Sequence, residues 1–273
     1  MQTRFQSHFS TIVKANESNI WADSYYLSTQ HEAAGHIRAR TADFIIEAAG
    51  WNVYRSCGVN ETGQASVSQL AGQEAYFNIG PALSNAFGEK ENFQKELVAE
   101  CVRGIIQAET YVYQARGFES PESYDREWKK FYANSCRYYS NLDRVSTEWH
   151  EHVGKQARKS FLFQRNKTVS ISFDSGKLLI TGSFSDSFHQ LAVNVTLADG
   201  VIANCTGNLL RAPDNVCFES KTYLTEIIGL KMSELNKKAI AKALGGSQGC
   251  IHLIDIFSEM VRSFGFFTAI AGE

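Results

Sequence analysis

The strand pattern that organises the chain is clearest in residues 168–182, which read TVSISFDSGKLLITG. Polar and apolar residues alternate on both sides of residues 174–177 (DSGK), as in two antiparallel strands joined by a tight turn. Alternation starts again in residues 189–197, and after an Ala-Asp-Gly turn a further apolar stretch returns in residues 201–208. These residues therefore predict a four-stranded antiparallel meander.

Beyond Phe218 the apolar residues recur every three or four positions, which is the spacing of one face of an amphipathic helix. Such a face is present in turn in residues 223–228, 235–243 and 253–264, and two glycines end the middle stretch. A sheet followed by helices is an α+β unit.

The beginning of the chain resembles this unit. Residues 10–45 resemble residues 168–203 at an offset of 158, so that His31 falls on His189. Each copy then continues through a cysteine, Cys57 or Cys217, and closes on a second cysteine that opens a long apolar helix, Cys101 or Cys250. We therefore predict an α+β fold of two tandem, internally duplicated units, each a meander of about four strands followed by helices.

A long helical segment is expected to join the copies. The predicted boundaries are a first copy at 1–118, a helical connector at 119–167 and a second copy at 168–273. Ser120 and Pro121 form a helix-start signal for the connector, which contains ten basic and seven acidic residues. Its residues 148–152 (EWHEH) are interpreted as a solvated helix. Its last basic residues form either a solvated face or a phosphate or nucleic-acid patch: Lys155, Arg158, Lys159, Arg165 and Lys167.

The composition limits the classes of function. Of 273 residues, 44 % are hydrophobic and 21 % charged, the net charge is −2, the pI is near 6.4, and the mean hydropathy is −0.25. This is a globular chain without the basic field expected of a nucleic-acid partner or the polybasic tail of a membrane-surface protein. The chain lacks an apolar run of transmembrane length and an apolar N-terminal signal, so we expect a cytoplasmic protein. Six sparse cysteines predict reduced thiols.

The second copy carries the residues best suited to chemistry. They are His189, Cys217, Cys250 and His252, each expected at the start or end of a strand or helix. A helix N-terminus favours thiolate over thiol, and two sulfur and two imidazole ligands suit tetrahedral zinc or an iron–sulfur cluster. Their spacing matches no zinc finger, and buried cysteines acting as small apolar residues are the alternative.

A family resemblance supports the metal hypothesis. Residues 186–264 resemble the U-type iron–sulfur cluster assembly scaffolds (the IscU, SufU and NifU N-terminal family), through HQLAVNV at 189–195, DGVI at 199–202 and CFESKTYLTEIIGLKMSEL at 217–235. Residues 245–253 also resemble an uncharacterised bacterial family, the domain of unknown function 2889. The scaffold resemblance implies a ligand set at His189, Cys217, Cys250 and His252.

The departures from that family are informative. His189 replaces the first scaffold cysteine, and the terminal His-Cys pair is here Cys-x-His, so two thiolates remain. In the first copy the equivalent, degenerate site is expected at His31, Cys57, Cys101 and Arg103. Arginine cannot bind a metal, so Arg103 either pairs with an anion or serves a structural role.

Three functional hypotheses follow. The first is an accessory, scaffold-like protein that binds zinc or an iron–sulfur cluster and serves a protein partner such as a metalloenzyme or assembly factor. The second is an enzyme with Cys250 as the nucleophile in acyl or sulfur transfer. The third is a non-catalytic ligand-binding or interaction module. Whether the protein is an enzyme stays open, with a non-enzyme favoured, and the oligomeric state is unspecified.

Overall fold

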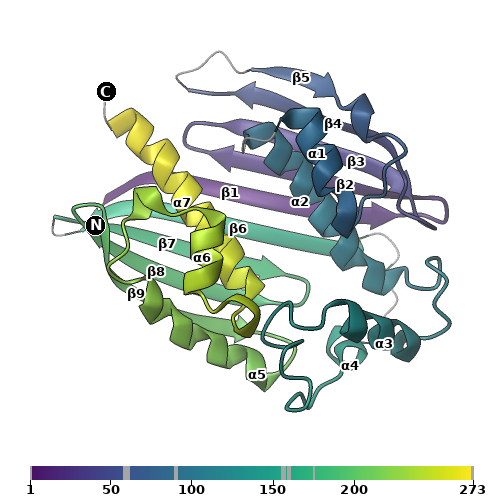
Figure 1. Ribbon diagram of the computed structural model, residues 1–273. Helices are drawn as coiled ribbons and strands as arrows, with labels where there is room; N and C mark the ends of the chain where they lie inside the picture. The colour runs from purple at the N-terminus through teal and green to yellow at the C-terminus, as the bar shows by residue number, and fades with distance from the viewer. Residues whose placement is uncertain are drawn as a thin grey trace. The chain divides into compact units, whose positions relative to one another are not determined.

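A computed structural model describes residues 2–57, 62–88, 92–154, 158, 161–174 and 176–271. Nine strands and seven α-helices lie within this described part, which confirms the α+β class (Figure 1). The contacts divide the chain into two units. The C-terminal unit comprises Met1–Ser7, Asp125–Lys155 and Lys167–Glu273, and the N-terminal unit comprises His8–Tyr124 and Gln156–Asn166.

The C-terminal unit contains the predicted meander. Its strands are β6 (Phe163–Asp174), which belongs to this unit from Lys167 onward, β7 (Lys177–Asp186), β8 (Gln190–Ala198) and β9 (Val201–Arg211), hydrogen-bonded in the order β6-β7-β8-β9. The β7–β8 and β8–β9 pairs are antiparallel. Between β8 and β9, Asp199 and Gly200 have φ angles of 51° and 77°, the left-handed geometry that an Asp-Gly turn requires. Ser175, in the first predicted turn, lies outside the described residues.

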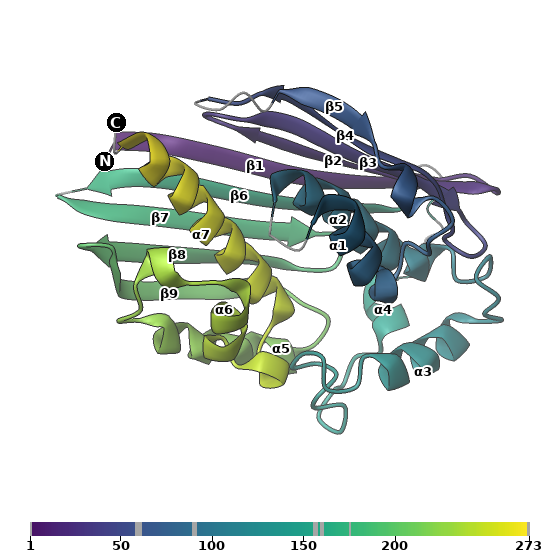
Figure 2. The same cartoon turned by 45° about the horizontal axis from the view of Figure 1, so that its top comes forward.

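Three α-helices follow this meander: α5 (Asn215–Phe218), α6 (Lys237–Ala243) and α7 (Ile251–Ala271). The first predicted helical face lies in a 3₁₀ segment, Glu219–Ile227, while α6 and α7 carry the other two. The long helix α7 crosses the meander and contacts β7 (Figure 2). Gly182 allows this approach, because a Cβ atom there would lie 2.7 Å from the sulfur of Met260.

The N-terminal unit has a similar plan. Its strands are β1 (Gln2–Ala15), which belongs to this unit from His8 onward, β2 (Asn19–Ser28), β3 (Glu32–Arg40), β4 (Ile46–Arg55) and β5 (Gly63–Ser66), in the order β5-β4-β3-β2-β1. The helices α1 (Gly80–Phe87) and α2 (Phe93–Ala108) follow. The helix α2 packs on β2 and β3. Ser24 donates a hydrogen bond to the carbonyl of Leu97 (2.7 Å), and a Cβ at Gly35 would lie 2.8 Å from the Leu97 carbonyl carbon.

Both units contain the same local irregularities. The β3–β4 ladder shifts register after Glu32 and after Arg38, and the β8–β9 ladder shifts after Gln190 and after Thr196, 158 positions further along the chain. In each unit a residue beyond the strands also pairs back with the residue just before β4 or with the first residue of β9, through an isolated bridge. These bridges are Ile45–Glu74 in the N-terminal unit and Val201–Lys231 in the C-terminal unit.

The predicted connector contains two separate helices, α3 (Pro121–Phe131) and α4 (Trp149–Val153). Its last basic residues do not form a continuous solvated face. Arg165 and Lys167 are buried, with ion pairs to Glu100 (3.6 Å) and Glu259 (3.4 Å). Arg158 lies over the ring of Tyr111, and Lys155 and Lys159 lie outside the described residues. No helix in the described ranges is both long and apolar enough to span a bilayer.

Candidate metal centre

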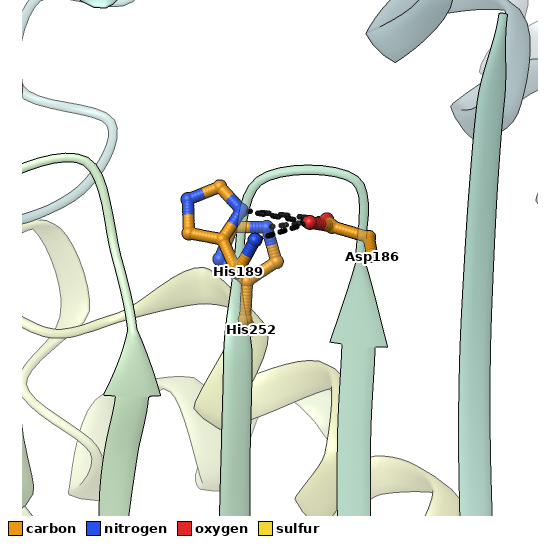
Figure 3. Close-up of side chains that lie close together, drawn as sticks. All are labelled: Asp186, His189 and His252. Carbon is orange, nitrogen blue, oxygen red and sulfur yellow. Dashed lines mark hydrogen bonds and ion pairs between the residues drawn. The ribbon is translucent and has the colours of Figure 1, made fainter. Parts of the chain in front are cut away.

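The loop between β7 and β8 holds an aspartate and a histidine side by side (Figure 3). Asp186, at the end of β7, accepts hydrogen bonds through Oδ1 from the backbone N–H groups of Phe188 (2.7 Å) and His189 (2.6 Å). Arg211 of β9 donates to the carbonyls of Asp186 (2.7 Å) and Ser187 (2.8 Å). These bonds satisfy the polar groups of the loop and fix the direction of both side chains.

A second imidazole reaches this loop from α7. The His252 ring packs against the His189 ring at a centroid distance of 3.8 Å and an angle of 30°. His189 Nδ1 lies 3.1 Å from Oδ1 of Asp186, and His252 Nε2 lies 3.7 Å from Oδ2 (Figure 3). Among the described residues, this is the one group in which three or more potential ligand atoms lie within 4.8 Å of one another.

The carboxylate of this cluster is buried and charged. The Asp186 side chain is 1 % exposed, and each imidazole is 12 % exposed. Burial by itself would raise the pKa of Asp186, but the charge of His189, its hydrogen bond and the charge of His252 hold the pKa well below its usual range. The site therefore combines a buried negative charge with two imidazoles that keep a small exposed area.

Aromatic side chains surround the cluster. Phe184 of β7 packs against His252 at 4.9 Å, and Trp149 of α4 packs against Phe188 at 4.8 Å and stacks on His189 at 6.3 Å. His152, one turn after Trp149, donates through Nε2 to the Phe188 carbonyl (3.0 Å). The prediction of a solvated helix at residues 148–152 is therefore wrong for Trp149 and His152, whose rings pack against this loop.

The four predicted ligands do not form a single group in the described structure. His189 and His252 come together, and the Cys250 sulfur lies 3.8 Å from His252 Nδ1, but Cys217 does not join them. Burial raises the pKa of both Cys217 and Cys250 to about 12. Desolvation thus opposes the thiolate stabilisation expected from a helix start, and it outweighs the hydrogen bonds near each sulfur.

Asp186 is the member of the cluster that sequence reasoning missed as a ligand. It precedes His189 by three residues and lies at the end of β7, beyond the strand predicted at residues 178–182, where a carboxylate commonly accepts backbone N–H groups. From that position alone, Asp186 would be interpreted as a residue that accepts hydrogen bonds from the backbone of the loop. The approach of α7, which depends on packing, adds the second imidazole.

The degenerate site predicted in the first copy is also dispersed. His31 follows β2 as His189 follows β7, but Cys57 is exposed and Cys101 lies buried in the middle of α2. Arg103 forms ion pairs with Glu96 (2.8 Å) and Glu100 (2.7 Å) of its own helix. The cysteines that closed both copies in the sequence comparison therefore occupy different places, since Cys250 precedes α7.

The residues that do match the cluster in the N-terminal unit are Ser28, His31 and Phe93. Ser28 Oγ accepts the backbone N–H groups of Gln30 (3.2 Å) and His31 (2.9 Å), as Asp186 does in its loop. Phe93, the first residue of α2, lies 5.8 Å from the His31 ring and 4.9 Å from the ring of Tyr26. A hydroxyl and a phenyl ring therefore stand where the C-terminal unit has a carboxylate and an imidazole.

Comparison with known proteins finds a family that is similar to part of the chain. Residues 167–264 match a family described as a protein of unknown function (DUF2889). This segment contains β7, β8, β9 and most of α7, and thus all three residues of the cluster. Comparisons with curated proteins and with solved structures give no match.

Proposed function

We propose that this protein binds one zinc or iron(II) ion through Asp186, His189 and His252. The observation that carries the proposal is the convergence of three potential ligand atoms within 4.8 Å at a buried loop. Ligands bonded to zinc at about 2.0–2.1 Å stand roughly 3.4 Å apart in a tetrahedron. The separations of 3.4 Å between His189 Nδ1 and Asp186 Oδ2 and 3.7 Å between His252 Nε2 and Oδ2 fit such an ion.

The donor chemistry favours a single ion. Two imidazoles and a carboxylate are the ligands of catalytic zinc and of mononuclear iron(II), while iron–sulfur clusters are held mainly by thiolates. We therefore retain zinc from the hypotheses based on the sequence. The resemblance to U-type scaffolds, which assemble iron–sulfur clusters, adds little support for this site. The proposed ligand set exchanges the two cysteines for Asp186.

The N-terminal unit supports a functional reading of these residues. Ser28 Oγ accepts a backbone N–H of its loop in the same way as the Asp186 carboxylate does. The apolar ring of Phe93 lies where the C-terminal unit has His252. The loop and the helix start therefore do not need a carboxylate or a second imidazole in order to fold. A buried charge that the fold does not require is a candidate for function.

Three protein ligands leave coordination positions for an exchangeable ligand, since structural zinc sites usually use four. The proposed role is accordingly metal handling or activation for a protein partner, in the cytoplasm, where reduced thiols are the rule. All six cysteines are unpaired, which agrees with that compartment. A nucleophilic Cys250 is the weaker alternative, because its thiol has a raised pKa of about 12.

We also propose that the two units arose by duplication. Their matching register shifts, bridges and loop caps support this, as do Arg55 and Arg211, which donate to equivalent loop carbonyls. In α2 and α7 the match continues at an offset of 159, where Glu100 and Arg103 correspond to Glu259 and Arg262. That offset aligns Cys101 with Met260.

Metal content tests the proposal. The protein is purified under reducing conditions, stripped with a chelator and titrated calorimetrically with Zn²⁺ and, without air, with Fe²⁺. A double variant, Asp186→Ser with His252→Phe, copies the N-terminal unit and should keep its fold while losing more than about 100-fold in affinity. The matched control is His31→Phe, which should bind as the wild type does. Unchanged binding by the double variant would exclude this site.

A further inference from the structure

Three cysteine-bearing segments of the C-terminal unit converge on Arg137. Its backbone N–H donates to the carbonyl of Gly249 (2.8 Å), directly before Cys250. Its Nε donates to the carbonyl of Val216 (2.9 Å), directly before Cys217. Arg137 itself directly follows Cys136. Through its position and its hydrogen bonds, Arg137 therefore brings together three backbone segments, each next to a cysteine, that are widely separated in sequence.

Further contacts hold the segments in this arrangement. Ser140 donates to the carbonyl of Ser247 (2.7 Å), Asn141 to the side chain of Gln248 (3.2 Å), and Arg137 and Arg144 both form ion pairs with Glu219. The loop after Cys136 is thus attached both to the segment before α7 and to the segment after α5.

The three thiols are close enough to act on one another electrostatically: Cys136 acts on both Cys217 and Cys250, and Cys250 acts on Cys217. Cys217 and Cys250 belong to the hydrophobic core, and Cys136 packs against it. Backbone hydrogen bonds from Tyr138 and Tyr139 act to lower the pKa of Cys136, and one from His252 acts to lower the pKa of Cys250, against the larger effect of burial. Backbone N–H groups aimed at sulfur stabilise thiolates, which are the form that binds metals.

We propose that Cys136, Cys217 and Cys250 form a second metal site, which takes a thiophilic ion such as Zn²⁺ or Cd²⁺ as three thiolates. Binding releases the three thiol protons to solvent and requires no oxidant. The sulfurs must move closer by side-chain rotation, because within the described residues the cluster at Asp186 alone has its donor atoms within 4.8 Å. The charge of the ion offsets the burial that raises the pKa of all three thiols.

His252 lies between the two sites. Its Nε2 faces Asp186 and its Nδ1 lies 3.8 Å from the Cys250 sulfur. The imidazole can therefore complete a three-sulfur, one-nitrogen set, the composition of many structural zinc sites, or remain with the Asp186 cluster. The four ligands expected from sequence thus divide between two neighbouring donor sets, one of oxygen and nitrogen and one of sulfur.

Spectroscopy separates this proposal from the one above. The full chain, kept reduced with a phosphine, is titrated with Co²⁺ and Cd²⁺, whose sulfur-to-metal charge-transfer bands report thiolate ligation alone. We expect bands of three-thiolate intensity. They should persist in Asp186→Ser with His189→Ala, which removes two ligands of the first site and leaves His252 in place.

Variants then identify the ligands. Cys136→Ser should reduce the band by about one third and the Cd²⁺ affinity by at least about tenfold. The control is Cys205→Ala, a buried cysteine of β9 outside this group, which should leave the band unchanged. A wild-type protein without a band, or a band that Cys136→Ser does not alter, would overturn the proposal, and either result would leave the Asp186 site untouched.

Discussion

His252 and Phe93 occupy equivalent places in the two units. Each lies at the start of the helix that covers its meander, and each ring packs 4.9 Å from the aromatic residue two positions before the loop cap, Phe184 or Tyr26. The difference is chemical. The His252 ring lies 3.8 Å from His189, while the Phe93 ring lies 5.8 Å from His31. One unit thus offers two imidazoles where the other offers one.

This equivalence predicts that the metal site can be copied. Ser28→Asp with Phe93→His would give the N-terminal unit a carboxylate and two imidazoles, with His31 already in position. We expect one additional zinc or iron(II) ion per chain, measured by elemental analysis of the purified variant. Ser28→Asp alone is the control and should add none. If the double variant folds and takes up no additional ion, the equivalence does not extend to metal binding.

The close approach of α2 to β3 depends on Gly35. An alanine Cβ there would lie 2.8 to 2.9 Å from the backbone of Leu97, which cannot move without shifting the helix. We expect Gly35→Ala to lower the free energy of unfolding by about 1–3 kcal/mol, measured by urea denaturation. Gly265→Ala in α7 meets no atom within 4 Å, so it should instead stabilise by about 1 kcal/mol. Equal effects at both positions would argue against this packing.

The buried pair of Lys167 and Glu259 should be sensitive to losing one partner. Both side chains are at most 4 % exposed, and Glu259 also pairs with Arg262. Glu259→Ala leaves the Lys167 ammonium buried with less compensation, so we expect a loss of about 3–5 kcal/mol of unfolding free energy. Lys167→Met combined with Glu259→Leu should recover most of that loss. A double variant no more stable than Glu259→Ala would contradict the account.

Asp214 links α5 to the predicted connector. Its Oδ1 accepts the N–H of Val216, and its Oδ2 accepts the N–H groups of Ser146 and Thr147 and the Ser146 hydroxyl, all at 2.9 to 3.0 Å. Burial acts to raise the pKa of Asp214, but these hydrogen bonds outweigh it and hold the pKa below its usual value.

A lowered pKa in the folded state determines the sign of the pH effect. The carboxylate contributes its full stability above the unfolded pKa of about 3.9, and that contribution is lost as the pH falls through the lower folded pKa. Asp214→Asn should therefore unfold more easily than the wild type at pH 7, by about 1–2 kcal/mol. The difference should shrink below about pH 4, as followed by denaturation at several pH values. A difference independent of pH would exclude the charge as its source.

Local patterns were sufficient for the meander and for α7. Alternating residues, an Asp-Gly turn and a three-to-four-residue apolar repeat depend on neighbours along the chain, so β7, β8 and β9 could be predicted from them. The closing cysteines could not be matched correctly in the same way. Cys101 and Cys250 look alike when the two halves of the sequence are aligned. Which residues of α2 and α7 contact the strands depends on packing, and the alignment does not contain that information.

The amino-acid sequence by itself determined the α+β class and the placement of His189 and His252 among the candidate ligands, because local periodicity and residue chemistry are properties of short segments. Only the tertiary structure decided that Asp186 joins them and that Arg165 and Lys167 are buried in ion pairs. These relationships arise where segments distant in sequence pack together, and burial and pairing of charge are properties of that packing.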